Sequence, residues 1–220
     1  MISFDLEKNT LRGLNELLQS QSTIITDRDW EIENPKGAHS IAVGLDAAIN
    51  ILVKGSTGYY CGGMNQNATI RVLGSVGPGV AENMMSGSLT VEGNASQYAG
   101  ATGHGGTLII KGNASSRCGI SMKGIDIIVH GNIGHMSAFM GQKGTLVVCG
   151  DAGDALGDSL YETKIFVRGK VKSLGTDCIE KEVKSKDLKH LTNLLRNADS
   201  DLNPREFKRY GSARKLYNFD

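Results

Sequence analysis

The segment LTVEGNASQYAG, residues 89–100, recurs after a 19-residue interval as LIIKGNASSRCG, residues 108–119, and once more as IIVHGNIGHMSA, residues 127–138. In each copy a short run of alternating apolar residues ends at a glycine, which we call the corner glycine. It recurs at the same interval without an insertion or a deletion. The seven corner glycines are Gly55, Gly74, Gly93, Gly112, Gly131, Gly150 and Gly169. A fixed period over this many copies predicts a repeat architecture, in which stacked copies share one core.

The positions four and two residues before each corner glycine are aliphatic in every copy. They hold Ile51, Ile70, Leu89, Leu108, Ile127, Leu146 and Ile165, and then Val53, Val72, Val91, Ile110, Val129, Val148 and Val167. A spacing of two is the period of a β-strand, so both positions face the same side, which we expect to be the interior. Polar residues stand beside them and are expected to face outward: Lys54, Arg71, Thr90, Glu92, Lys111, His130 and Arg168.

A 19-residue unit predicts a parallel β-helix. It is too short for the paired helices of ankyrin, tetratricopeptide or armadillo repeats, and it breaks the hexapeptide register of a left-handed β-helix. The sequence therefore predicts an all-β fold, a right-handed parallel β-helix of seven 19-residue coils, with the handedness taken from the general preference of parallel crossovers. Strands about 4.8 Å apart would make the prism roughly 34 Å long.

Two features of the corners have physical explanations in the sequence. The corner glycines are expected because sharp bends need positive φ angles and because a Cβ atom would crowd the neighbouring coil. Asn94, Asn113, Asn132 and Asp151 directly follow four of these glycines. We expect them to form a ladder of side chains that pair with one another along the stack.

The chain divides into three parts: residues 1–50, an N-terminal helix and degenerate lead-in coils; residues 51–175, the β-helix; and residues 176–220, a capping helix and a docking arm. Thr10 is the candidate N-cap of the first helix. The apolar face of this first helix would cover one open end of the β-helix, and that of a second helix over residues 184–197 would cover the other. These faces consist of Leu11, Leu14, Leu17 and Leu18, and of Leu188, Leu191, Leu194 and Leu195.

The C-terminal segment REFKRYGSARKLYNFD, residues 205–220, is rich in basic and aromatic side chains. We interpret it as an arm that docks on a partner chain, since aromatic residues and arginine are typical of interface centres. The alternative is that it packs on the chain's own helix. The candidate contacts are Arg205, Phe207, Arg209, Tyr210, Arg214, Tyr217 and Phe219.

The composition excludes several functions that depend on bulk charge or on membranes. With 24 Lys and Arg against 23 Asp and Glu, nucleic-acid and membrane-surface partners are not expected. The N-terminus lacks the pattern of a signal peptide and no apolar run approaches the ~18 residues of a membrane span, which predicts a cytoplasmic protein. The four cysteines show no metal-binding spacing and are expected to be reduced, buried thiols.

No catalytic, cofactor-binding or metal-binding residue is expected in this chain. The motifs GxxxxGK[ST], HExxH, GxSxG and a strand-linked GxGxxG are absent. His104, His130 and His135 occupy different positions of the repeat and would not converge on a metal. Four acids, Asp151, Asp154, Asp158 and Glu162, are spread around the sixth coil. We interpret them as solvated corners or a partner contact rather than the calcium-binding face of a polysaccharide-degrading β-helix.

The repeat, and above all VEGNASQYAGATGHGGTLII (91–110), is similar to the GXGXG repeat in the C-terminal β-helix of the glutamate synthase large subunit. One chain of formylmethanofuran dehydrogenase carries a related repeat. Segments outside this stretch, NPKGAHSIAVGL (34–45), residues 118–162 and RYGSARKLYNF (209–219), extend the likeness over nearly the whole chain. The chain thereby resembles the free-standing glutamate synthase-like β-helix subunit, of GlxC type, in the N-methylglutamate synthase (methylamine–glutamate N-methyltransferase) family.

The resemblance implies a complex of three chains. A class II amidotransferase-like subunit and a synthase-like subunit, which binds FMN and an iron–sulfur cluster, would be joined by this β-helix. The complex would convert methylamine and glutamate to N-methylglutamate and ammonia. The resemblance carries no catalytic or cofactor-binding residue onto this chain. The alternatives are the equivalent subunit of a glutamate synthase or formylmethanofuran dehydrogenase complex, and a stand-alone polysaccharide-active β-helix.

Overall fold

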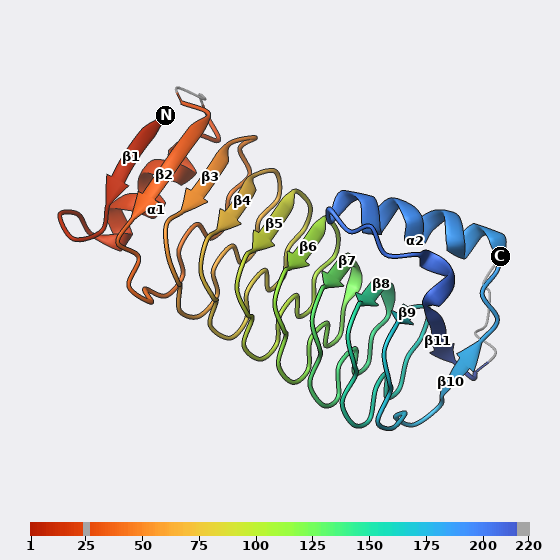
Figure 1. Cartoon of the computed structure of the whole chain (residues 1–220). Coiled ribbons are helices and arrows are strands. Elements are labelled where there is room, and N and C mark those ends of the chain that lie inside the picture. Colours follow the sequence, from red (N-terminus) through yellow and green to blue (C-terminus); the bar gives the residue numbers. More distant parts are fainter. Residues whose placement is uncertain (24–26, 215–220) are drawn as a thin grey trace.

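The computed structural model describes residues 1–23 and 27–214, and within them the chain is an elongated solenoid with its termini at opposite ends (Figure 1). Its sheet has the strand order β1-β2-β3-β4-β5-β6-β7-β8-β9-β11-β10. The strands are β1 Ile2–Asp5, β2 Asp29–Glu33, β3 Asn50–Val53, β4 Thr69–Val72, β5 Ser88–Val91, β6 Thr107–Ile110, β7 Lys123–Val129, β8 Lys143–Val148, β9 Lys164–Val167, β10 Cys178–Lys181 and β11 Lys208–Ser212. The helices are α1 Leu11–Ser20 and α2 Ser185–Asn197, with a 3-10 turn at Pro204–Glu206.

The predicted parallel β-helix is confirmed. Strands β3 to β9 pair in parallel, and the register follows the 19-residue period, with Ile51 opposite Ile70 and Ile70 opposite Leu89. Both aliphatic positions of every coil are almost completely buried in one continuous core. A second parallel ladder of isolated bridges runs two residues after each corner glycine. It joins Thr57, Val76, Ala95, Ala114, Ile133, Ala152 and Val171.

The corner glycines are explained by crowding rather than by backbone conformation. Of the seven, Gly55 alone has φ in the left-handed region, at 141°. A Cβ atom on Gly74 would lie 2.5 Å from the backbone nitrogen of Ser56, and one on Gly112 would lie 2.7 Å from the carbonyl oxygen of Gly93. The prediction of close approach between stacked coils is therefore correct, whereas the prediction of positive φ is wrong at six of these positions.

Positive φ angles recur instead five, seven and nine residues after the corner glycine, and most of these residues are not glycine. In the third coil they are Tyr98, Gly100 and Thr102, with φ of 63°, 67° and 55°. Their N–H groups point alternately along the stack: Tyr98 donates to Ser116 and Thr102 to Ile120 in the next coil, while Gly100 donates to Val80 in the previous one. Bonding to both neighbouring coils offsets the cost of the left-handed conformation, about 1 kcal/mol or more for each non-glycine residue.

The side-chain ladder at the corners exists, but its bonds differ from those predicted. The side-chain oxygen of Asn94 accepts the backbone N–H of Asn113 at 2.8 Å, and Asn113 does the same for Asn132. The ladder continues through Asn132 and Asp151 to the N–H of Lys170. Each side chain thus satisfies a main-chain donor of the next coil, and the expected pairing between side-chain amides is not the interaction that forms.

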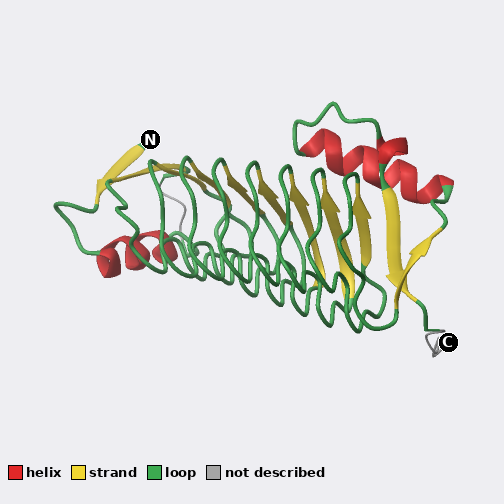
Figure 2. Ribbon diagram, turned by 60° about the horizontal axis from the view of Figure 1, so that its bottom comes forward, coloured by secondary structure: helices red, strands yellow, loops and turns green. Residues whose placement is uncertain are grey.

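Helix α1 covers the N-terminal end of the solenoid, as predicted (Figure 2). Thr10 caps it by accepting the N–H of Gly13, and Leu14 and Leu18 are fully buried. The amide of Asn15 donates to the carbonyl of Ser40 and accepts the N–H of Ala42 in the first lead-in coil. Because these groups lie at an open edge, the helix replaces the hydrogen bonds that a further coil would supply. Leu17, expected on the buried face, is 46% exposed.

Helix α2 does not cap the C-terminal end; it lies along the outward face of the sheet (Figures 1 and 2). The outward position of the strands changes from Arg71 and Thr90 to Ile109, Ile128, Val147 and Phe166 in the later coils. These four residues are buried in a second apolar cluster with Leu191, Leu194, Leu195 and Phe207. At the sheet's C-terminal end, β11 instead pairs antiparallel with β9, and β10 pairs antiparallel with β11.

Candidate interaction surfaces and pockets

The predicted docking arm is largely part of the fold, so this prediction is wrong for its central residues. Tyr210 belongs to β11 and reaches the main core, and Phe207 lies under α2; the two are 5% and 3% exposed. Arg209 stands between them along the chain and faces the helix side, where it lies near Asp187 of α2. The alternative interpretation, packing against the chain's own helix and sheet, is what the structure shows for these three residues.

The remaining arm residues have different environments. Arg205 lies in the exposed 3-10 turn, where its backbone N–H is bound by the side chain of Asn203. Arg214 pairs with Asp177, its Nη2 atom 2.5 Å from the carboxylate. Tyr217 and Phe219 lie outside the described residues. Of the seven candidate contacts, Arg205 and Arg214 are therefore the described ones that stay on the surface.

Helix α2 is attached to the sheet by a buried charge. Asp187 in its first turn is 1% exposed at the side chain and lies 3.1 Å from Lys164 of β9 and 3.7 Å from Arg209 of β11. Burial acts to raise the pKa of Asp187, but the backbone N–H of Lys184 and these two cations hold it below the ordinary value. One carboxylate thus joins the helix to two strands.

Each acid of the sixth coil except Glu162 is bound to the coil that follows it. Asp151 accepts the N–H of Lys170, Asp154 pairs with Lys172 at 2.7 Å, and Asp158 accepts the N–H of Thr176 at 3.2 Å. Glu162 is exposed. Within residues 1–23 and 27–214, no group of three or more His, Cys, Asp or Glu is placed to hold a metal ion. Asp151, Asp154 and Asp158 therefore fasten the sixth coil to the next one, a role that the interpretation as solvated corners or a partner contact did not include.

The cysteines and histidines also do not converge. All four cysteines are free and buried, as expected, and burial raises the pKa of Cys61 to about 11 and that of Cys118 to about 12. Such thiols carry almost no thiolate at neutral pH, so they are poor nucleophiles. His130 lies beside Lys111 under the end of α2, where burial and that lysine lower its pKa. His104 and His135 are exposed on other coils.

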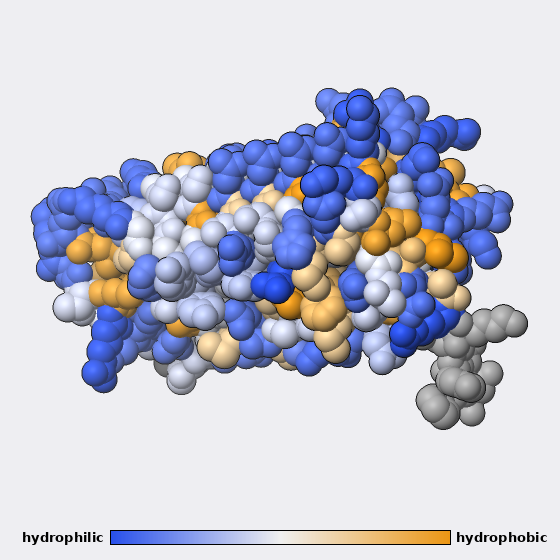
Figure 3. Space-filling model, turned by 90° about the horizontal axis from the view of Figure 1, so that it is seen from below, coloured by the Kyte–Doolittle hydropathy of each residue, from blue (hydrophilic) through white to orange (hydrophobic). Residues whose placement is uncertain are grey.

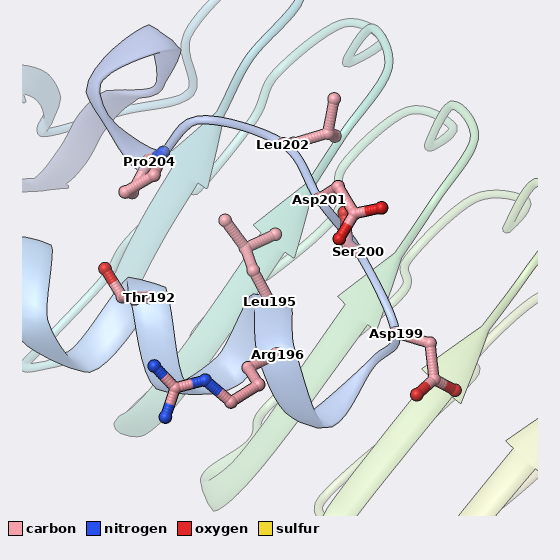
Figure 4. Close-up of a pocket in the computed structure, with 8 residues that line it drawn as sticks. All are labelled: Thr192, Leu195, Arg196, Asp199, Ser200, Asp201, Leu202 and Pro204. Atoms are coloured by element: carbon pink, nitrogen blue, oxygen red, sulfur yellow. The ribbon is translucent and has the colours of Figure 1, made fainter.

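The surface offers shallow hollows and apolar side chains. One hollow of about 500 Å³ lies between the end of α2 and the segment that follows it (Figure 4), lined by Thr192, Leu195, Arg196, Asp199, Ser200, Asp201, Leu202 and Pro204. In Figure 4, Arg196 and Asp201 point to different sides and do not form a common site. Apolar and polar side chains are mixed on the face seen in Figure 3. The exposed apolar residues of the coils include Tyr59, Tyr60, Met64, Met85, Met140 and Tyr161.

Comparison with known proteins identifies the family. No family model matches the chain. It is 65% identical over 217 residues to Protein GlxC of Rhizobium meliloti (strain 1021), and the match covers 98% of this chain and 95% of that protein. The chain belongs to the GlxC family. This confirms the GlxC-type likeness predicted from the motifs, whereas the activity of the complex stays a prediction.

The GlxC match also constrains the architecture of the relative. Because it covers 95% of that protein, the R. meliloti GlxC is a chain of similar size. The aligned region includes the solenoid and nearly all of the segments that cover its ends. Among the described residues, no helix is long and apolar enough to cross a membrane.

Proposed function

We propose that this chain is the non-catalytic scaffold subunit of a glutamate synthase-like flavoenzyme complex, N-methylglutamate synthase, which converts methylamine and glutamate to N-methylglutamate and ammonia. The observation that carries the proposal is the 65% identity to GlxC over nearly the full length of both chains. The solenoid with its GXGXG-type repeat supports the same proposal. The partners are a class II amidotransferase-like subunit and a synthase-like subunit that holds FMN and an iron–sulfur cluster. The complex would act in the cytoplasm.

The geometry supports a scaffold because the prism is held together along its whole length. Adjacent coils share the main strand ladder, the second ladder of bridges and the side-chain ladder at the corners. Between β3 and β9 the core contains no break, and both ends are covered by other segments of the chain. A body of this kind fixes the distance and orientation between proteins bound at different coils, which is what paired active sites require.

The side chains that could have suggested catalysis are engaged in the fold. Asp154 and Asp158 each bind the next coil, and the buried cysteines have raised pKa values. These contacts give the stand-alone polysaccharide-active alternative no support. The glutamate synthase and formylmethanofuran dehydrogenase alternatives rest on a similar repeat, so the product of the complex must distinguish among the three.

The proposal is tested by removing the chain from its native cells. We expect extracts to lose methylamine-dependent formation of N-methylglutamate, and the wild-type chain to restore it. Because the proposal assigns no chemistry to this chain, an Asp154→Asn, Asp158→Asn double variant should restore the same rate within about twofold. Retained N-methylglutamate formation in the absence of the chain would contradict the proposal, and loss of glutamate formation from glutamine instead would favour a glutamate synthase.

A further inference from the structure

A second hollow, of about 370 Å³, lies at the C-terminal end of the solenoid. Its walls come from the end of β10, from β11, from the segment leading into α2 and from the turn before β9. Gly211 of β11 lines the hollow. A Cβ atom at Gly211 would have Lys181 Cγ at 3.7 Å and the carbonyl oxygen of Thr163 at 3.8 Å as its nearest neighbours, which are ordinary contact distances. The hollow is therefore open above this residue.

Two residues that line this hollow carry buried polar atoms without a hydrogen-bond partner. Among the described residues, such atoms are Thr57 Oγ1, His130 Nε2, Thr163 Oγ1 and Arg209 Nε. Thr163, 2% exposed, and Arg209 both line the hollow. A buried donor left without a partner is unfavourable, so a second group that satisfies it is favoured.

Positive charge exceeds negative charge around the hollow. Its cationic residues are Lys181, Lys184, Arg209 and Arg214, against Glu162 and Glu182, and Arg214 is already paired with Asp177. Helix α2 begins directly after Lys184, and the N-terminal end of a helix adds a partial positive charge. Asp187 already serves Lys164 and Arg209 together, so a single carboxylate is shared by two cations.

The orientation of Arg209 selects the kind of ligand. Its Nη1 atom donates to the carbonyl of Glu182 at 3.2 Å, which leaves the Nε–H edge of the guanidinium unpaired. A guanidinium edge matches two oxygens held in one plane, as in a carboxylate or a phosphate. The lysines and the start of α2 favour the same negative charge.

We propose that this hollow binds a small oxyanion, a carboxylate or a phosphate, through Arg209 with Lys181 and Lys184 beside it. The site is separate from the scaffold role and does not depend on it. Bound anion would supply the missing partner of Arg209 where β10, β11 and the start of α2 meet. It would also balance the positive charge that Asp177 and Asp187 do not neutralise.

The test titrates the purified full-length chain with succinate and, separately, with inorganic phosphate, at constant ionic strength set with chloride. Calorimetry measures saturable binding. Gly211→Val fills the open space without a strained backbone and should abolish binding, while Lys181→Gln should weaken it about tenfold, the loss expected for one charge-assisted hydrogen bond. Lys143→Gln removes an exposed charge at the start of β8, outside the hollow, and should change the affinity less than about twofold.

Comparing the two anions shows whether the site binds a carboxylate or a phosphate. Saturable binding of succinate alone assigns the site to carboxylates, and saturable binding of phosphate assigns it to phosphate. Thermal unfolding of each variant shows that the fold is retained. No saturable binding of either anion above the chloride background would overturn the proposal, as would binding that survives in a folded Gly211→Val variant.

Discussion

At the residue scale, each coil is fastened to the next by small polar side chains at the corners. The side-chain oxygens of Asn94, Asn113 and Asn132 each accept one backbone N–H at 2.8 Å from the following coil. The column could be predicted from the sequence because the asparagines follow corner glycines at a fixed period. The donor that each oxygen binds could not, since a repeated asparagine fits side-chain pairing as well as main-chain bonding.

Replacing one member of this ladder should weaken the stack locally. Asn94→Ala leaves the N–H of Asn113 without its partner, and we expect the free energy of unfolding to fall by about 1 kcal/mol in denaturant titrations. Gln97→Ala changes an exposed residue of the same coil and serves as the control, with a change below about 0.5 kcal/mol. Equal effects of the two substitutions on the free energy of unfolding would contradict a stabilising role for the side-chain ladder.

The residues whose backbone adopts the left-handed conformation give a second prediction. Ser121 has φ of 51°, so Ser121→Val should lower the free energy of unfolding by about 1–2 kcal/mol, because β-branched side chains fit this conformation poorly. Ser121→Gly should leave it unchanged or raise it by up to about 1 kcal/mol. Thr90→Gly, in the extended strand β5, should instead destabilise the chain. A destabilising Ser121→Gly would show that the left-handed conformation is not the strained feature.

At the scale of elements, the helices show where sequence analysis reached its limit. The apolar face of α2 was predicted from the sequence, but its position on the sheet was not. Its binding site is the outward row Ile109, Ile128, Val147 and Phe166, which takes the place that Arg71 and Thr90 hold in the two preceding coils. This switch was a readable signal, because an apolar outward position in a solenoid needs a cover. Phe207 completes the same cover.

Asp187 should make the attachment of α2 sensitive to acid. Its folded pKa lies below the ordinary 3.8, so its contribution is present above the unfolded pKa and is lost as the pH falls through the folded pKa. We expect Asp187→Asn to lower the free energy of unfolding by about 2 kcal/mol at neutral pH. The variant should also lose less stability than the wild type between about pH 5 and pH 2. Parallel stability curves over this range would contradict the role of Asp187.

Truncation distinguishes a docking arm from a structural segment. A chain that ends at Pro204 lacks β11 and Phe207, exposes the edge of β9 and uncovers part of α2, so we expect it to aggregate or to unfold at a temperature lower by about 10 °C. A chain that ends at Arg214 keeps all of these contacts and should unfold like the full chain. A folded, monomeric protein that ends at Pro204 and keeps the full unfolding temperature would restore the interpretation as a free arm.

At the scale of the whole molecule, the 19-residue period was enough to predict the architecture. The aliphatic residues at positions such as Leu89 and Val91 set the strand face, and the fixed period set the parallel register. The period carried no information about what covers the ends, because those segments do not repeat. The hollow lined by Gly211 was equally hidden, since its walls meet only after β10, β11 and α2 assemble.

The period can be tested directly by removing one coil. Deletion of residues 75–93 joins Gly74 to Asn94 and should give a folded chain with a cooperative thermal transition and one strand fewer. Deletion of residues 75–92 stops one residue short of a full period and shifts every following position by one, which turns the aliphatic positions outward. We expect this variant to be insoluble or to lack a cooperative transition by circular dichroism. Similar behaviour of the two deletions would contradict the coil as the structural unit.

The scaffold role is tested most directly by isolating the chain from its native cells under mild conditions. The bound proteins are identified by mass spectrometry, and the visible spectrum of the assembly is recorded. The proposed function predicts a flavin-coloured assembly that contains an amidotransferase-like chain and a synthase-like chain in fixed proportion. A colourless, solitary protein would contradict it.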